Sequence, residues 1–150
     1  MIGKLSRLAS LSWTERRVLL QAVLLLPLFA AGLRLLGLGR LRAWLVRAPA
    51  TGPVSRLVFD PATMGALINS AGANLPARAT CLTRSLLLDW MLRRQGVQSE
   101  LRIGVRMAGG ALDAHAWVEC DGRPVNDAPD VAQRFAAFDG PLPARSFPAS

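Results

Sequence analysis

The chain has 150 residues, of which 51% are apolar and 6% aromatic, and its formal net charge is +8 at pH 7. This apolar content excludes a chain that is disordered throughout. Two cysteines are too few for a disulfide scaffold, and a single histidine without neighbouring pairs of cysteines excludes a Cys–His zinc site. The length suits one compact domain with a helical extension.

The positive charge is concentrated near the N-terminus. Residues 1–59 hold nine Lys or Arg against one acid, Glu15, whereas residues 60–150 hold nine basic and nine acidic residues. A neutral body with a basic extension is therefore expected. The regions expected are a basic, leucine-rich helical extension over 1–53, a core over 54–140 and a proline-containing tail over 141–150.

The first fifty residues carry the signals of three helices. Ser12 and Glu15 have the spacing of a capping box, which predicts that a helix begins at Trp13. Pro27 lacks a backbone donor and is expected to break or kink this helix. The two further helical stretches expected are Leu28–Leu36, ended by Gly37, and Leu41–Val46.

The uncharged run Val18–Leu33 is shorter than the roughly twenty residues of a membrane span, although a single span and a signal peptide stay open as alternatives. Leucines on every side of the helix favour burial against protein on more than one side. The arginines form either a merely solvated face or a patch for an acidic partner, an anionic membrane surface or nucleic acid. No zinc-finger spacing or aromatic RNA-binding motif accompanies them, so nucleic acid is not expected. These arginines are Arg34, Arg40, Arg42 and Arg47.

The order of the remaining elements predicts an α+β body, because helices precede antiparallel strands. Asp60 and Pro61 predict the start of a helix that ends near Gly72. A second helix is expected over Cys81–Gln95, with Gly96 after it. The strands expected are Val97–Val105, Asp113–Cys120 and Arg123–Asp127, with a turn at Gly109-Gly110 between the first two.

A thiol and an imidazole are the candidate catalytic groups. Cys81 opens a helix, where free backbone N–H groups and the positive dipole end favour a thiolate. Arg78 and Arg84 are near it in sequence and can add to this effect. A thiol nucleophile needs a positioned base, and His115 is the one histidine of the chain. Either residue alone is more often structural, so the pair carries the hypothesis.

The turn after the second strand decides which residue faces His115. A two-residue turn at Asp121-Gly122 would place Ala128 opposite the histidine. A three-residue loop, Cys120 to Gly122, would place Asp127 there, with the two side chains on one face. We expect the three-residue loop, which predicts a Cys–His–Asp site in which Asp127 orients the imidazole. Asp113, two residues from His115 along the strand, is the rival orienting acid.

Other residues near these three receive weaker assignments. Trp117 shares the face of His115 and is expected either to contact substrate or to fill the core. Cys120 lies on the opposite face and is expected to be structural, and Glu119 is expected to be solvated. Asn74 and Thr80 are candidates for a second donor to an oxyanion, beside the backbone N–H of Cys81.

Five short blocks, in order within residues 76–127, carry a family resemblance. The blocks are CLTRSL at 81–86, LRRQGV at 92–97, LRIGV at 101–105, AHAWVE at 114–119 and PVND at 124–127. They resemble the transglutaminase-like cysteine peptidases of lasso-peptide biosynthesis, known as B2 proteins or leader peptidases. The resemblance implies a transglutaminase-like or papain-like core, in which the helix bearing the cysteine packs on an antiparallel sheet. It also places the nucleophile, base and orienting acid at Cys81, His115 and Asp127.

The resemblance implies an activity and a set of partners. The enzyme would hydrolyse one peptide bond of a ribosomally made precursor in the cytoplasm, without metal or cofactor, and a macrolactam cyclase would then act on the product. Because residues 1–59 show no strand pattern, the leader-recognition (B1-type) protein is expected to be separate, with Arg40, Arg42 and Arg47 as its candidate dock. The alternatives are acyl transfer by a transglutaminase or amidase with the same triad, and a non-catalytic, membrane-associated scaffold.

Overall fold

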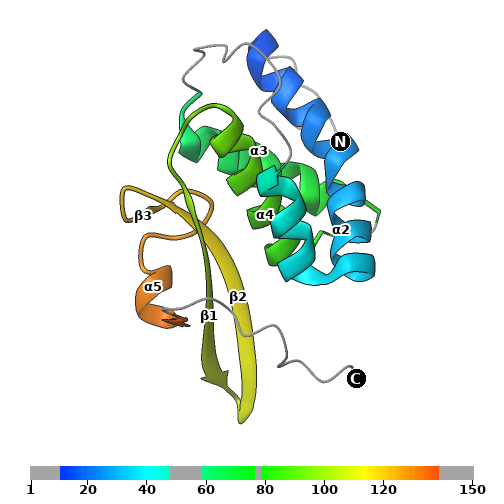
Figure 1. The fold of residues 1–150 in the computed structure, drawn as a ribbon. Helices are drawn as coiled ribbons and strands as arrows, with labels where there is room; N and C mark the ends of the chain where they lie inside the picture. The colour runs from blue at the N-terminus through cyan, green and yellow to red at the C-terminus, as the bar shows by residue number, and fades with distance from the viewer. Residues whose placement is uncertain (1–10, 48–58, 77–78, 139–150) are drawn as a thin grey trace.

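The structure is a computed structural model that describes residues 11–47, 59–76 and 79–138. Helices α2, α3 and α4 lie together on one side of an antiparallel sheet, and the short helix α5 lies on the other side (Figure 1). The α+β class expected from the sequence is confirmed. The expected tail over 141–150 lies outside the described residues. The elements are α2 (Trp13–Arg47), α3 (Pro61–Asn74), α4 (Cys81–Arg94), β1 (Glu100–Ala108), β2 (Ala111–Cys120), β3 (Arg123–Pro124), α5 (Val131–Arg134) and β4 (Ala136–Ala137).

The sheet is built around one long hairpin. Its strand order is β3-β2-β1-β4, and β1 pairs with β2 from Glu100 opposite Glu119 to Ala108 opposite Ala111. Gly109 and Gly110 connect them, as predicted, and both have positive φ, at 57° and 83°. Two consecutive positive φ angles match the right-handed twist of the flanking strands and are the usual choice for a two-residue hairpin loop.

The second turn differs from the prediction. Cys120 pairs with Arg123, so the loop contains two residues rather than three. Asp121 and Gly122 both have positive φ, at 51° and 73°. Aspartate tolerates this backbone region better than most residues, so Asp-Gly suits the tight turn. The expected register, with Asp127 directly opposite His115 in a ladder, is therefore wrong.

The third strand is also shorter than expected. β3 contains only Arg123 and Pro124, although the prediction extended it to Asp127. The backbone N–H of Val125 still donates to the oxygen of Val118 at 2.9 Å. After this bond the chain leaves the sheet. Among the described residues, β3 therefore does not pair with the part of β2 that contains His115.

Helix α2 begins as predicted but does not stop at Pro27. The backbone N–H of Ser12 donates to the Glu15 carboxylate at 2.7 Å, which forms the expected capping box. The side-chain and backbone groups of Ser12 lower the pKa of Glu15 through these hydrogen bonds. Pro27 stays within the helix, and the interruption comes at Gly37, whose φ of 73° only glycine adopts readily. Proline has no backbone N–H, so the helix lacks one hydrogen bond at Pro27, and packing of α2 against the rest of the protein offsets this loss.

The two parts of α2 on either side of Gly37 fold back on each other (Figure 1). A Cβ at Gly32 would lie 3.1 Å from the side chain of Leu41, so this glycine permits their close approach. Buried residues of α2 belong to the same hydrophobic cluster as buried residues of α3 and α4. This cluster therefore joins the extension expected over 1–53 to the region expected over 54–140. Burial of α2 is one-sided, however, and the expectation of burial on several sides is wrong. The buried residues of α2 are Val18, Ala22, Leu26, Phe29, Leu41 and Leu45.

Helices α3 and α4 follow the capping signals in the sequence. The Asp60 carboxylate accepts from the backbone N–H of Thr63 at 2.8 Å, and Pro61 occupies the first turn. These hydrogen bonds from Thr63 lower the pKa of Asp60. At the other end of the pair, Gly96 follows α4 with a φ of 76°. Both helices thus begin at the predicted residues, and Cys81 is at the first position of α4.

Candidate active site

Cys81 is held at the start of α4 by the cap that precedes it. The Thr80 hydroxyl accepts from the backbone N–H of Thr83 at 3.2 Å, and the two hydroxyls lie 2.9 Å apart. These bonds occupy the Thr80 side chain, which the sequence made a candidate oxyanion donor. The half-buried Cys81 lines a small cavity of about 80 Å³. The cavity is lined by Asn69, Cys81, Arg84, Ser85, His115, Ala116, Asn126 and Asp127.

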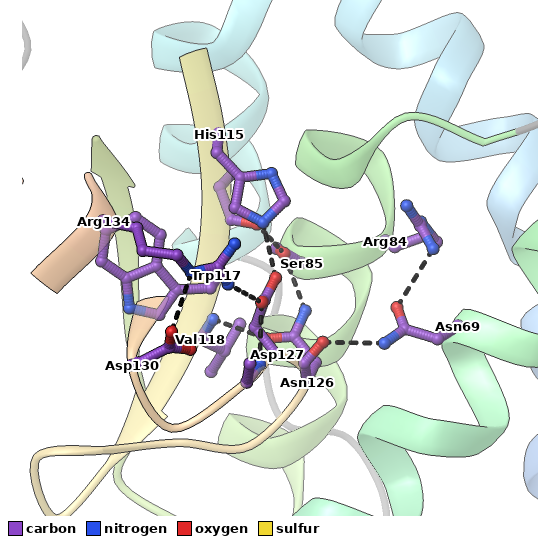
Figure 2. A network of polar contacts seen from close by, with 12 residues as sticks. Asn69, Arg84, Ser85, His115, Trp117, Val118, Asn126, Asp127, Asp130 and Arg134 are labelled. Atoms are coloured by element: carbon purple, nitrogen blue, oxygen red, sulfur yellow. Dashed lines mark hydrogen bonds and ion pairs between the residues drawn. The ribbon is translucent and has the colours of Figure 1, made fainter. Parts of the chain in front are cut away.

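His115 and Asp127 are in direct contact in this cavity. The Nε2 atom of His115 lies 2.5 Å from Oδ2 of Asp127 (Figure 2). The contact predicted from the sequence is therefore present, although the register that predicted it is not. Asp127 reaches the histidine from a loop rather than from a paired strand, because β3 ends at Pro124.

Asn126 fixes this loop with its side chain. Its Oδ1 accepts from the backbone N–H of Val118 at 2.8 Å, in place of a backbone carbonyl. Its Nδ2 donates to Oγ of Ser85 at 2.9 Å, and the Ser85 hydroxyl donates to the oxygen of Ala116 at 3.0 Å. The Asn69 amide donates to the backbone oxygen of Asn126 at 2.8 Å. Figure 2 shows how these bonds join α3, α4, β2 and the loop at one point.

Both carboxylate oxygens of Asp127 have partners. While Oδ2 faces His115, Oδ1 accepts from the backbone N–H of Ala128 at 2.8 Å and lies 3.4 Å from Nη2 of Arg134. An ionised carboxylate only accepts hydrogen bonds, so a neutral His115 in this contact donates through Nε2 and keeps its lone pair at Nδ1. The imidazole is thereby prepared to act as a base through Nδ1.

Aromatic rings support the imidazole from the side of α5. The ring of Phe135 lies 5.0 Å from that of His115, centroid to centroid, and the ring of Trp117 lies 6.3 Å away. Trp117 is completely buried, and its indole N–H donates to Glu119 at 2.9 Å. Its role is core packing beside the site, because no indole surface is left for a substrate. Glu119 pairs with Arg102 at 3.2 Å with its side chain only 12% exposed, so the expectation that it is solvated is wrong.

The rival acid and the second cysteine lie away from the cavity. Asp113 pairs with Arg106 at 2.8 Å across the hairpin, so it does not orient His115. Cys120 packs against the main core on the face of β2 opposite the histidine, which fits the structural role expected of it. Burial raises the pKa of the Cys120 thiol, and the negative charges of Asp121 and Asp89 raise it further.

Sequence reasoning missed most of the residues that position the site. Asn69, Ser85, Asn126 and Arg134 lie on four different segments, and no periodic pattern links them. Arg84, expected near the thiol, does line the cavity. The other expected neighbour, Arg78, is not among the described residues. Among the candidates that do not meet the site, Asn74 donates to the oxygen of Ser70 within α3 and does not line the cavity.

The candidate partner dock lies in the last part of α2. Arg40 and Arg47 are exposed and Arg42 is half-buried. None of the three lines the cavity that contains Cys81 and His115, so a role for them would lie in binding rather than in chemistry. Within residues 11–47, 59–76 and 79–138, no group of three or more His, Cys, Asp or Glu could hold a metal ion.

Comparison with known proteins identifies the family of the chain. The sequence profile described as "Transglutaminase-like superfamily" matches residues 23–138. The chain belongs to this superfamily, and the match includes most of α2. It is also 33% identical over 61 residues to the "Microcin J25-processing protein McjB" of Escherichia coli, a segment that covers 41% of this chain and 28% of that protein. This similarity supports the resemblance to B2 proteins of lasso-peptide biosynthesis. No solved structure matches the chain.

Proposed function

We propose that the protein is a cysteine peptidase that removes the leader from a ribosomally synthesised lasso-peptide precursor. The observation that carries the proposal is the His115–Asp127 pair, which lines one cavity with the cysteine at the start of α4. The superfamily supports thiol chemistry at this site. The McjB similarity, in a protein named for processing microcin J25, supports a peptide precursor as substrate.

In the first step, Nδ1 of His115 takes the proton from the thiol of Cys81. The sulfur then attacks the carbonyl carbon of the scissile peptide bond and forms a tetrahedral intermediate. The resulting imidazolium is stabilised by Asp127, which stays ionised and holds the ring in place through Nε2. When the intermediate collapses, the C–N bond breaks and His115 gives its proton to the leaving amine.

In the second step, water replaces the amine. His115 takes a proton from the water, whose oxygen attacks the thioester carbonyl, and the thiolate of Cys81 leaves and regains a proton. The products are a carboxylic acid and the free enzyme. In both steps negative charge develops on the former carbonyl oxygen. The backbone N–H of Cys81 is the expected donor to it, since the first N–H groups of a helix lack internal partners, and Arg84 adds a cation to the cavity wall.

The proposal includes partners and a location. A separate leader-recognition protein would present the precursor, and a macrolactam cyclase would receive the product in the cytoplasm, where thiols stay reduced. The basic surface formed by the exposed Arg40 and Arg47 and the half-buried Arg42 is the proposed dock for the leader-bound recognition protein. Reversal of these three arginines to Glu is expected to weaken capture of that complex in a pull-down. Equal capture by the reversed variant would remove this dock from the proposal.

The activity is tested by incubating the protein with its precursor peptide and recognition protein, followed by mass spectrometry. Hydrolysis predicts two fragments whose masses together equal the precursor plus one water. The Cys81→Ala variant should give no fragments, whereas Cys120→Ala, the matched control, should retain activity. Processing by Cys81→Ala at the normal rate would overturn the proposal. A product joined to an added amine would instead identify acyl transfer.

A further inference from the structure

The solvent side of α2 is apolar, contrary to the usual pattern of a surface helix. Seven large apolar side chains of α2 have 61% to 82% of their surface exposed. The five that precede Gly37 follow a spacing of four and seven residues, which places them along one side of the helix. We name this set the outer face. It consists of Trp13, Leu20, Leu24, Leu28 and Leu35.

The opposite side of the same helix is buried in the protein core. Val18, Ala22, Leu26 and Phe29 are at most 6% exposed and pack in the cluster that includes residues of α3 and α4. By length and composition α2 could cross a membrane, but a crossing would strip this buried side from the core. The helix is therefore suited to lie on an apolar surface with its outer face, not to cross one.

Charge limits what can cover the outer face. Arg16 and Arg17 lie before the leucines of the outer face, and Arg34 lies near its end. At 1.5 Å of rise per residue, Arg17 and Arg34 are about 25 Å apart along the helix axis. The one acid within residues 1–59 is Glu15, which is engaged in the capping box. A second copy of this face would therefore bring arginines against arginines in either orientation. A surface with negative charge above an apolar layer complements both features.

From these observations we infer that the outer face of α2 binds the surface of an anionic lipid bilayer, with the leucines inserted at the boundary between headgroups and acyl chains. Trp13, which is 73% exposed, suits this boundary because its ring is apolar with one polar edge. The arginines contact lipid headgroups at both ends of the apolar stretch. Such binding holds the enzyme in the membrane plane and leaves the catalytic cavity, which contains no residue of α2, in water.

The inference is tested by sedimentation of the full chain with vesicles. With vesicles containing about 30% phosphatidylglycerol in phosphatidylcholine, most of the protein should sediment at low salt. Pure phosphatidylcholine should bind at least ten-fold less, and high salt should weaken binding to the anionic vesicles. A triple substitution, Leu20→Gln, Leu24→Gln and Leu28→Gln, should lower the apparent affinity at least ten-fold.

A matched control removes exposed apolar surface elsewhere. Met107 and Leu112 lie near the tip of the β1–β2 hairpin with 69% and 66% exposure, and Met107→Gln with Leu112→Gln should leave vesicle binding unchanged. Circular dichroism verifies that both variants are folded. Precursor cleavage in solution is measured separately, so loss of lipid binding and loss of activity are distinguished.

Three results would overturn the inference. One is equal binding by wild type and the triple variant, and another is no binding by folded wild type. The third is self-association or binding of the recognition protein that the triple variant abolishes while vesicle binding persists, because a protein partner would then cover the outer face.

Discussion

The two hairpins that share β2 hold their residues in different ways. In the β1–β2 hairpin, nine residue pairs form a continuous backbone ladder from Glu100 to Ala108. In the β2–β3 hairpin the ladder has two pairs, and the side chain of Asn126 then takes over the bond to Val118. The first hairpin fixes His115 by regular pairing, whereas the second places Asp127 through side-chain hydrogen bonds.

This difference shows how the site escapes the alternation of a strand. In a continued β3, the observed two-residue turn would direct Asp127 away from His115. Because the chain leaves the sheet after Val125, the loop can turn its carboxylate back to the imidazole. The position of Asp127, the proposed orienting carboxylate, therefore depends on the irregular hairpin more than on the regular one.

The largest effect should come from removing the charge that this irregular hairpin supplies. Asp127→Asn is expected to lower kcat for precursor cleavage about 10³- to 10⁴-fold, because an amide can hold the imidazole in the wrong tautomer and cannot stabilise the imidazolium. Asp113 lies on the same face of β2 as His115 but pairs with Arg106, so Asp113→Asn is the matched control and should change kcat less than about three-fold. Timed mass spectrometry of the fragments measures both. A fall of less than ten-fold for Asp127→Asn would show that this carboxylate does not orient the base.

The sequence predicted the components of this pair but not the way in which they meet. Caps and periodicity placed Cys81 and His115 correctly, because these signals act over a few residues. The choice between a two- and a three-residue loop at Asp121-Gly122 depends on whether aspartate accepts a positive φ, and the prediction chose the wrong loop. The Asn126 network joins segments up to 57 residues apart, so no local pattern reveals it.

The next effect concerns the bond that replaces the ladder. Asn126→Ala should lower the free energy of unfolding by about 2–3 kcal/mol, because the Val118 N–H loses its partner in a partly buried site and the Ser85 hydroxyl keeps only its bond to Ala116. Asn74→Ala, on the exposed surface of α3, should cost less than about 1 kcal/mol. Urea unfolding followed by circular dichroism compares them. Similar midpoints for the two variants would mean that the loop does not depend on this side chain.

A smaller effect should come from the surface on which the loop rests. A Cβ at Gly65 would lie 2.3 Å from the backbone oxygen of Val125, so Gly65→Ala must push the loop away from α3. We expect a loss of about 1–3 kcal/mol in stability, together with reduced cleavage activity. Gly39→Ala is the matched control, because nothing lies within 4 Å of its Cβ position and alanine favours the helix. It should be neutral or slightly stabilising in the same urea titration. If Gly65→Ala behaves like the control, the close packing of α3 against the loop is not required.

Helix α2 gives the corresponding lesson away from the site. Its start at Trp13 followed from the capping box, but its continuation past Pro27 and its one-sided burial did not. A helix with leucine on every side has no polar face that would indicate which side meets the core. That choice is made by the residues of α3 and α4 with which the helix packs.

The smallest effect concerns Cys120, which lies at the turn that sets the register. Its raised pKa lowers the fraction of thiolate below that of an ordinary cysteine, and alkylation requires the thiolate. The stability associated with this protonated thiol is present at neutral pH and is lost as the pH rises through the raised pKa.

Asp121→Asn removes one of the charges that raise the pKa of Cys120, and asparagine accepts the same positive φ. In a Cys81→Ala background this substitution should speed alkylation of Cys120 by iodoacetamide a few-fold, while Asp130→Asn should not. Burial, the first cause of the shift, remains, so the labelling stays slower than that of a free thiol. An unchanged or slower rate in Asp121→Asn would mean that the charge at this turn does not reach the sulfur.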